Sequence, residues 1–349
     1  MKRIDSHQAL KQTKSGRTAK YIALAVILLL LLTQPFWGSA YLHSIVNLMF
    51  LYLSLAQMWN LMGGYTGLVS LGQQAFIGLG GYSVAVLAQG YGMPVFLGVI
   101  TAIVVSVVFA LIISLPIFKM KGVYFTIGTW IVAEALGVFF VNWMFVNAGR
   151  GYNIRVAYDM PITYFSYFCL AIGLGSVFLV YIILRSKLGL ALMGMRDNES
   201  AAEVRGVRLY RTKLICFVIS ACWTAITGCA FFLNITYVVP ASAFSIEWTV
   251  SAIFIVIIGG IGTIEGPIIG VVIYIFLRQY LINYPGYSNI ILGAIAIILI
   301  IVAPKGIMGY LHDKLGWDII SVRRWFTNNA IDYSKPVCNH SASDTNDAE

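Results

Sequence analysis

The run Val95–Ile117, VFLGVITAIVVSVVFALIISLPI, contains no charged side chain. An α-helix rises about 1.5 Å per residue, so this run is long enough to cross the roughly 30 Å hydrocarbon core of a bilayer. Comparable runs recur along the whole chain, which is 59% hydrophobic and 11% charged. A soluble domain carries about 25% charged residues. The sequence therefore predicts an all-α integral membrane protein that forms one bundle.

The basic residues predict an orientation for that bundle. The formal net charge is +9, but the lysines and arginines lie between apolar runs, as in cytoplasmic loops of membrane proteins and unlike a nucleic-acid-binding patch. Residues 1–20 are basic, and no small-residue cleavage site follows the next apolar run, so we expect a first helix and not a signal peptide. Four of the five cysteines lie inside apolar runs and are expected to be packing residues. No cofactor, metal site or catalytic residue is predicted.

The apolar runs also give the number of crossings. They are 21–36, 41–62, 68–88, 95–117, 123–146, 164–184, 214–233, 248–276 and 287–302. If 248–276 formed one helix, the basic C-terminal residues would lie outside, so we split it at Gly259–Gly262. The result is a bundle of about ten transmembrane helices with both termini cytoplasmic; eight or nine crossings are the alternatives if glycine-rich pieces are re-entrant or broken. The predicted regions are a cytoplasmic N-terminus (1–20), a transmembrane domain (21–309) and a partly disordered cytoplasmic tail (310–349).

The segment Asn60–Tyr82 departs from a plain apolar helix, because it contains seven glycines and two adjacent glutamines. Small residues allow close helix packing. They also allow a helix to unwind, and irregular backbone at membrane depth is tolerated where it is buried or lines a cavity. Both interpretations stay open. The candidate residues of a broken helix or substrate path are Gly67, Ser70, Gly72, Gln73, Gln74, Gly80 and Tyr82.

A second segment is the basic loop Arg185–Lys213, which we place in the cytoplasm. Asp197 or Asn198 is a suitable N-cap for a short helix, with Glu199 in its first turn and Gly206 at its end. The loop is either simply solvated or a docking surface for a soluble partner. The candidate docking residues are Arg196, Asp197, Asn198, Glu199, Ala202, Glu203 and Gly206.

The third segment is Gly259–Gly270, which lacks the Gly-Lys-Ser/Thr of a phosphate-binding loop. We predict a close-packed cytoplasmic turn formed by Gly259, Gly260, Gly262, Glu265 and Gly266. Glu134 is the acidic residue inside an apolar run. It either hydrogen-bonds another helix or marks the ion site of a secondary transporter.

Four stretches resemble LivM-type inner-membrane permeases of ABC importers for branched-chain amino acids: Gly64–Gln73, Gly189–Lys213, Gly259–Gly270 and Ala303–Gly306. This resemblance implies a multi-pass protein of a prokaryotic inner membrane, surrounded by lipid. It also implies three kinds of protein partner. An extracytoplasmic binding protein would deliver the substrate, a second homologous permease would share the path, and two ATPase subunits would dock on Arg196–Gly206 and hydrolyse ATP.

The resemblance is incomplete at two places. Many relatives have a histidine where this chain has Gln73, and the outer loop with Arg150 fits the family pattern only loosely. Two other functions are therefore kept as alternatives. One is the same kind of permease with urea or short amides as its cargo, and the other is an ion-coupled secondary transporter that uses Glu134.

Overall fold

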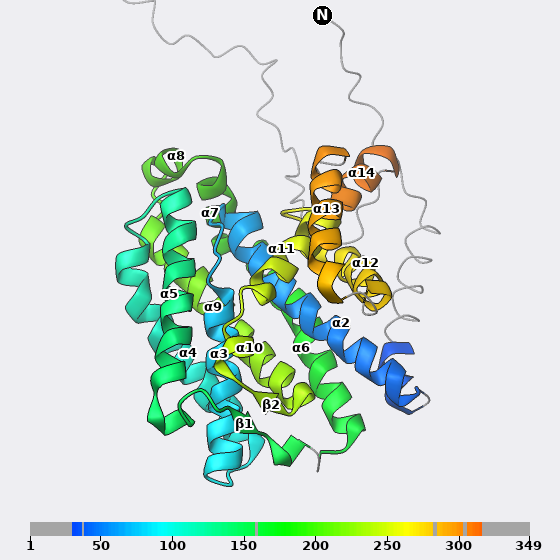
Figure 1. The fold of residues 1–349 in the computed structure, drawn as a ribbon. Coiled ribbons are helices and arrows are strands. Elements are labelled where there is room, and N and C mark those ends of the chain that lie inside the picture. The colour runs from blue at the N-terminus through cyan, green and yellow to red at the C-terminus, as the bar shows by residue number, and fades with distance from the viewer. Residues whose placement is uncertain (1–29, 37, 158–159, 282–284, 303–305, 316–349) are drawn as a thin grey trace, which may run out of the picture.

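The structure is a computed structural model that describes residues 30–36, 38–157, 160–281, 285–302 and 306–315 (Figure 1). In these residues, six helical stretches are long and apolar enough to cross a membrane: Ala40–Gly64, Val95–Ile117, Val123–Asn142, Ile162–Arg185, Leu209–Ile235 and Pro240–Gly259. This arrangement confirms a helical, multi-pass membrane protein. Ten crossings and the placement of the termini remain predictions, as does the division into three regions.

The long stretches correspond to named helices. They are α2 (Ala40–Trp59), extended by the π-helical turn η1 (Asn60–Gly64), α4 (Val95–Ile117), α5 (Val123–Asn142), α6 (Ile162–Arg185), α9 (Leu209–Ile235) and α10 (Pro240–Ala243) followed by α11 (Glu247–Gly259). Shorter helices are α3 (Gln73–Val84) with the π-turn η2 (Ala85–Gly90), α7 (Lys187–Asp197), α8 (Glu199–Val204), α12 (Gly266–Leu281), α13 (Pro285–Val302) and α14 (Gly306–Leu315). Helix α14 runs across the predicted start of the tail at residue 310.

The core forms where α3 packs against α9 and where α2 packs against α6 and α9. Glycines bring α3 and α9 into backbone contact: a Cβ added to Gly80 would lie 2.1 Å from the carbonyl oxygen of Ala225, and one added to Gly228 would lie 2.4 Å from that of Ile77. Such close approach is how small residues join membrane helices. The interpretation of the glycine-rich segment as a packing element is therefore confirmed for α3.

The glycine-rich run 68–88 is not helical throughout. The backbone after η1 leaves the helical conformation, and α3 begins only at Gln73. Gly67 has a φ of +74°, a value that glycine adopts without steric cost. The helix is therefore broken, as the alternative interpretation held.

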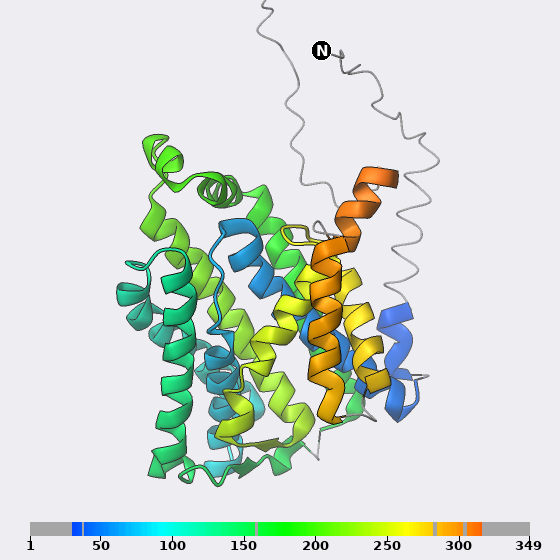
Figure 2. The same ribbon diagram turned by 45° about the horizontal axis from the view of Figure 1, so that its top comes forward.

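The predicted division of 248–276 is confirmed, since α11 ends at Gly259 and α12 starts at Gly266. Glycine is required at this crossing, because a Cβ on Gly270 would lie 2.0 Å from the carbonyl oxygen of Ile255. Figures 1 and 2 show α13 and α14 beside this hairpin, at one edge of the bundle.

A short strand pair is the exception to the predicted all-α fold. β1 (Tyr152–Asn153) pairs antiparallel with β2 (Tyr237–Val238), and Tyr152 lies opposite Val238. The pair joins the loop after α5 to the end of α9, at the end of the bundle away from α8 (Figure 1). The 3-10 turns η3 (Met144–Val146) and η4 (Arg155–Ala157) flank β1.

Candidate functional site

The loop between α6 and α9 folds into two helices that project from one end of the bundle (Figures 1 and 2). The predicted short helix is α8, and Asn198 is its N-cap: Asn198 Oδ1 accepts a hydrogen bond from the Ala201 amide at 3.0 Å. The chain leaves α8 through Gly206, whose φ is +86°. These local predictions are confirmed, whereas α7 was not predicted. The function of the segment as a docking site is a separate question.

Arg196, near the end of α7, brings the three predicted segments together. Its Cα and Cγ lie 3.7 Å from the position of a Cβ on Gly67, and its Nη1 lies 2.6 Å from that of a Cβ on Gly262. Arg196 also interacts with Tyr65, the residue after η1. The pKa of the Tyr65 phenol is raised, first by burial and then by the carboxylate of Glu265, and the charge of Arg196 opposes this increase. The loop, the broken helix and the glycine-rich turn therefore meet at one side chain.

An ion pair fastens α8 to the start of α9. Glu199 Oε1 lies 2.7 Å from Lys213 Nζ, and the Lys213 side chain is only 10% exposed. The Glu199 side chain is 38% exposed, so the pair is only partly buried. Removing Glu199 would leave the largely buried charge of Lys213 without compensation, which costs more than the loss of a fully exposed pair. Glu199 is thus a structural residue of the loop as well as a candidate docking residue.

Two side-chain amides, one in α2 and one in η1, form hydrogen bonds with the glycine-rich turn. The sequence analysis did not predict this role. Asn60 Nδ2 donates to the carbonyl of Thr263 at 2.8 Å, and Asn60 Oδ1 accepts from the amide of Gly262 at 2.9 Å. Gln57 Nε2 donates to the carbonyl of Ile264 at 2.8 Å. Two amide side chains three positions apart in an apolar run were the signal that could have indicated this role.

The broken segment Gly67–Gly72 is held by helices on both sides. Three side chains bond its backbone: Trp59 Nε1 donates to Ser70 O (2.9 Å), Thr126 Oγ1 donates to Val69 O (2.8 Å), and Thr129 Oγ1 accepts from Leu71 N (3.0 Å). Trp59 belongs to α2, and the two threonines belong to α5. Side chains of neighbouring helices thereby satisfy three backbone groups of this irregular segment.

The candidate path residues of α3 are buried by the chain itself. Gln73 is 4% exposed, and within the described residues neither of its amide atoms has a hydrogen-bond partner. Gln74 accepts a hydrogen bond from the hydroxyl of Thr249 on α11. Tyr82 packs against the rings of Phe140 and Phe244, with centroids 4.7 and 6.0 Å away, and these two rings also contact each other. That these residues face a substrate path stays a prediction.

Within the described residues, Glu134 bonds its own helix and not another one, so a bond to another helix stays a prediction. Its Oε1 accepts from Trp130 Nε1 on the same helix at 3.0 Å, and its side chain is exposed. The spacing of four residues places both side chains on one side of α5. Side chains four apart on a helix are neighbours, so a local bond competes with an interhelical one.

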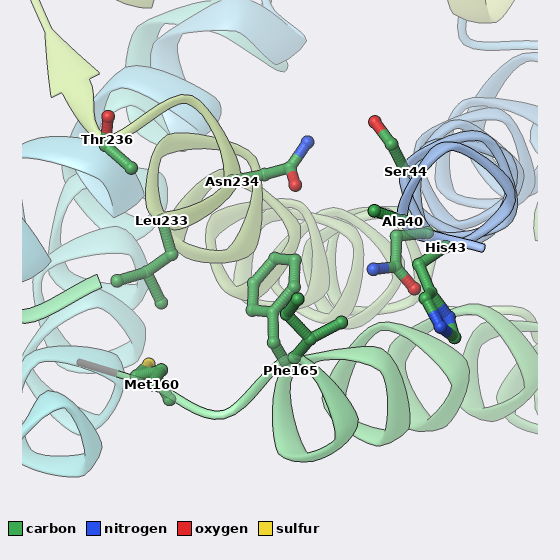
Figure 3. Close-up of a pocket in the computed structure, with 10 residues that line it drawn as sticks. Ala40, His43, Ser44, Met160, Phe165, Leu233, Asn234 and Thr236 are labelled. Atoms are coloured by element: carbon green, nitrogen blue, oxygen red, sulfur yellow. The ribbon is translucent and has the colours of Figure 1, made fainter. Parts of the chain in front are cut away.

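A cavity of about 190 Å³ lies between α2, α6 and α9 (Figure 3). The parts of these helices that line it belong to the end of the bundle away from α8 (Figure 1). Its lining mixes polar and apolar side chains, among them His43, Ser44, Asn47, Phe165, Leu233 and Asn234. Asn47 Nδ2 donates to Ser166 Oγ at 3.2 Å, whereas its Oδ1 is buried without a partner in the described part of the chain. None of the residues predicted for the path lines this cavity.

These features define a polytopic membrane protein in which a two-helix segment at one end of the bundle is joined, through Arg196, to irregular segments of the helical bundle. The chain belongs to the family described as branched-chain amino acid transport system / permease component, whose model matches residues 41–303. It is therefore a transport subunit and not an enzyme.

Several characterised proteins are similar in sequence. The high-affinity branched-chain amino acid transport system permease protein LivM of Salmonella typhimurium is 24% identical over 86% of this chain and 78% of its own length. LivM of Escherichia coli is 23% identical with the same coverage. The ribose import permease protein RbsC of Haemophilus influenzae is 25% identical over 49% of this chain and 51% of its own length. No solved structure gives a significant match.

Proposed function

We propose that this chain is the membrane-spanning permease subunit of an ATP-driven importer for branched-chain or related aliphatic amino acids. Its family and its LivM relatives support the transport role and the class of cargo. A binding protein delivers the cargo at the outer end, and a second homologous permease completes the path. ATP hydrolysis takes place on two partner subunits in the cytoplasm of a prokaryotic cell.

The observation that carries the proposal is the position of Arg196. An importer of this kind needs a rigid connection between the ATPase and the membrane path, so that ATP binding changes the access of the path. Helices α7 and α8 supply a surface outside the bundle, and Arg196 lies against Gly67 of the broken helix and Gly262 of the turn. A displacement of α7 therefore acts on both segments at once.

The first experiment is purification of a tagged copy expressed with its native partners, followed by identification of the recovered subunits. We expect an ATPase and a second permease, with ATP-dependent uptake of leucine, isoleucine or valine in reconstituted vesicles. Uptake of urea in place of these amino acids would change the assigned cargo and leave the assignment as an ATP-driven importer intact. Recovery of this chain alone, active with an ion gradient, would contradict the proposal.

The Arg196→Ala variant tests the connection itself. We expect ATP hydrolysis to continue while uptake falls about tenfold, the effect of losing roughly 1.4 kcal/mol of coupling between two sites. Arg211→Ala is the matched control, because Arg211 is an exposed arginine in the first turn of α9, outside the segment Arg196–Gly206. Equal uptake by both variants would remove Arg196 from the coupling route.

A further inference from the structure

Helix α5 spans the membrane domain with one side uncovered by the rest of the described chain. In an apolar stretch of 18 residues of this helix, only 22% of the residues are buried. Its packing partners are α3, α10 and α4. Figures 1 and 2 show α5 along one side of the bundle, with no described element in front of it. Something outside the described residues covers that side, either lipid or protein.

The uncovered side carries polar groups, which we call the polar stripe: Trp130, Glu134 and Asn142. All three are exposed, and at 3.6 residues per turn they fall within about 120° of the helix circumference. Glu134 bonds Trp130, and Asn142 Nδ2 donates to the carbonyl of Val138 at 2.8 Å. Both bonds stay within α5, so they do not cover the stripe.

Helix α4 provides a comparison within the same molecule. The same share of residues, 22%, is buried in the corresponding apolar stretch of α4. However, every exposed side chain of α4 is apolar, for example Val104, Val108 and Ile112. This is the composition that lipid requires, whereas a carboxylate near the middle of a lipid-facing helix is costly. The difference between two equally uncovered helices points to lipid on α4 and to protein on α5.

We propose that the polar stripe is the face against which the second permease subunit packs, and that this subunit supplies a hydrogen-bond donor or a cation to Glu134. The inference rests on the proposed function, which requires such a subunit. An ATPase or a binding protein reaches only the ends of the bundle, and Glu134 lies near the middle of α5. The apolar residues beside the stripe, such as Ile127 and Ile131, pack against the same partner helix.

A photocrosslinking amino acid placed at two matched positions tests the face. Ile131 on α5 and Val108 on α4 are 58% and 50% exposed, and both lie within a membrane-spanning helix. In the complex purified from membranes, we expect p-benzoylphenylalanine at Ile131 to form an adduct with the second permease, and at Val108 to form none. Adducts from Val108 alone would overturn the inference and leave the importer function intact. A complex that contains no second permease would overturn both.

Substitution of Glu134 tests the chemistry of the contact. We expect Glu134→Leu to lower the amount of co-purified second permease about tenfold, as for the loss of one charge-assisted hydrogen bond. Glu134→Gln, which keeps a hydrogen-bonding group, should stay within about twofold of the parent. The thermal unfolding of the isolated subunit should not change, because Glu134 is exposed there. An intact complex that has lost uptake in Glu134→Leu would assign the carboxylate to the transported molecule and overturn the inference.

Discussion

Gly64 illustrates at the scale of one residue how tightly η1 meets the turn between α11 and α12. A Cβ at this position would lie 2.1 Å from Asn60 Oδ1 and 2.8 Å from the amide nitrogen of Gly262. The same Asn60 oxygen accepts the Gly262 amide, so neither group can move away without losing this partly buried hydrogen bond.

We therefore expect Gly64→Ala to destabilise the folded protein by about 1–3 kcal/mol, the usual effect of overpacking. Thermal unfolding of the purified protein in detergent measures this. The control is Gly194→Ala in α7, where an added Cβ meets nothing within 4 Å. Alanine at this helical position should be neutral or stabilising by up to about 1 kcal/mol. Similar destabilisation by both variants would contradict the steric argument.

At the scale of elements, α8 depends on its cap because it has only 6 residues. A helix this short is marginal by itself. Asn198→Ala removes the acceptor of the Ala201 amide and should cost about 1 kcal/mol, which accelerates amide hydrogen exchange within α8 about fivefold. Asn198→Asp should retain protection, since aspartate caps equally well. Unchanged exchange in Asn198→Ala would mean that the Glu199–Lys213 pair alone holds the helix.

The elements that could be predicted from sequence are those specified by local chemistry. The bounds of α4 follow from one uninterrupted apolar run, and α8 follows from Asn198 and Gly206. Contacts between distant segments could not be predicted. Arg196 against Gly67 and Gly262 joins three parts of the chain, and nothing in their separate patterns indicates which parts are neighbours. The exposed position of Glu134 was also hidden, because an apolar run does not reveal which side of a helix is covered.

At the scale of the whole molecule, α8 and the loop that contains η3 lie at opposite ends of the bundle (Figure 1). The basic loop predicts that the α8 end is cytoplasmic. We expect a cysteine in Glu203→Cys to react with a membrane-impermeant thiol reagent only in inside-out vesicles, and one in Met144→Cys only in right-side-out vesicles. Both positions are exposed, and Cys338→Ser removes the tail thiol from the background. The reverse pattern would invert the topology.

The hydrogen bonds of Gln57 and Asn60 with the turn at residues 262–264 have a consequence for biosynthesis. These bonds join residues that are 207 and 203 positions apart. At roughly 5–20 residues per second, the ribosome needs on the order of 10–40 s to deliver the second partner after the first. During that interval the side-chain amides of Gln57 and Asn60 are part of a nascent bundle in which their carbonyl acceptors have not yet been synthesised. A chain that stops before the turn leaves both amides without these two hydrogen bonds.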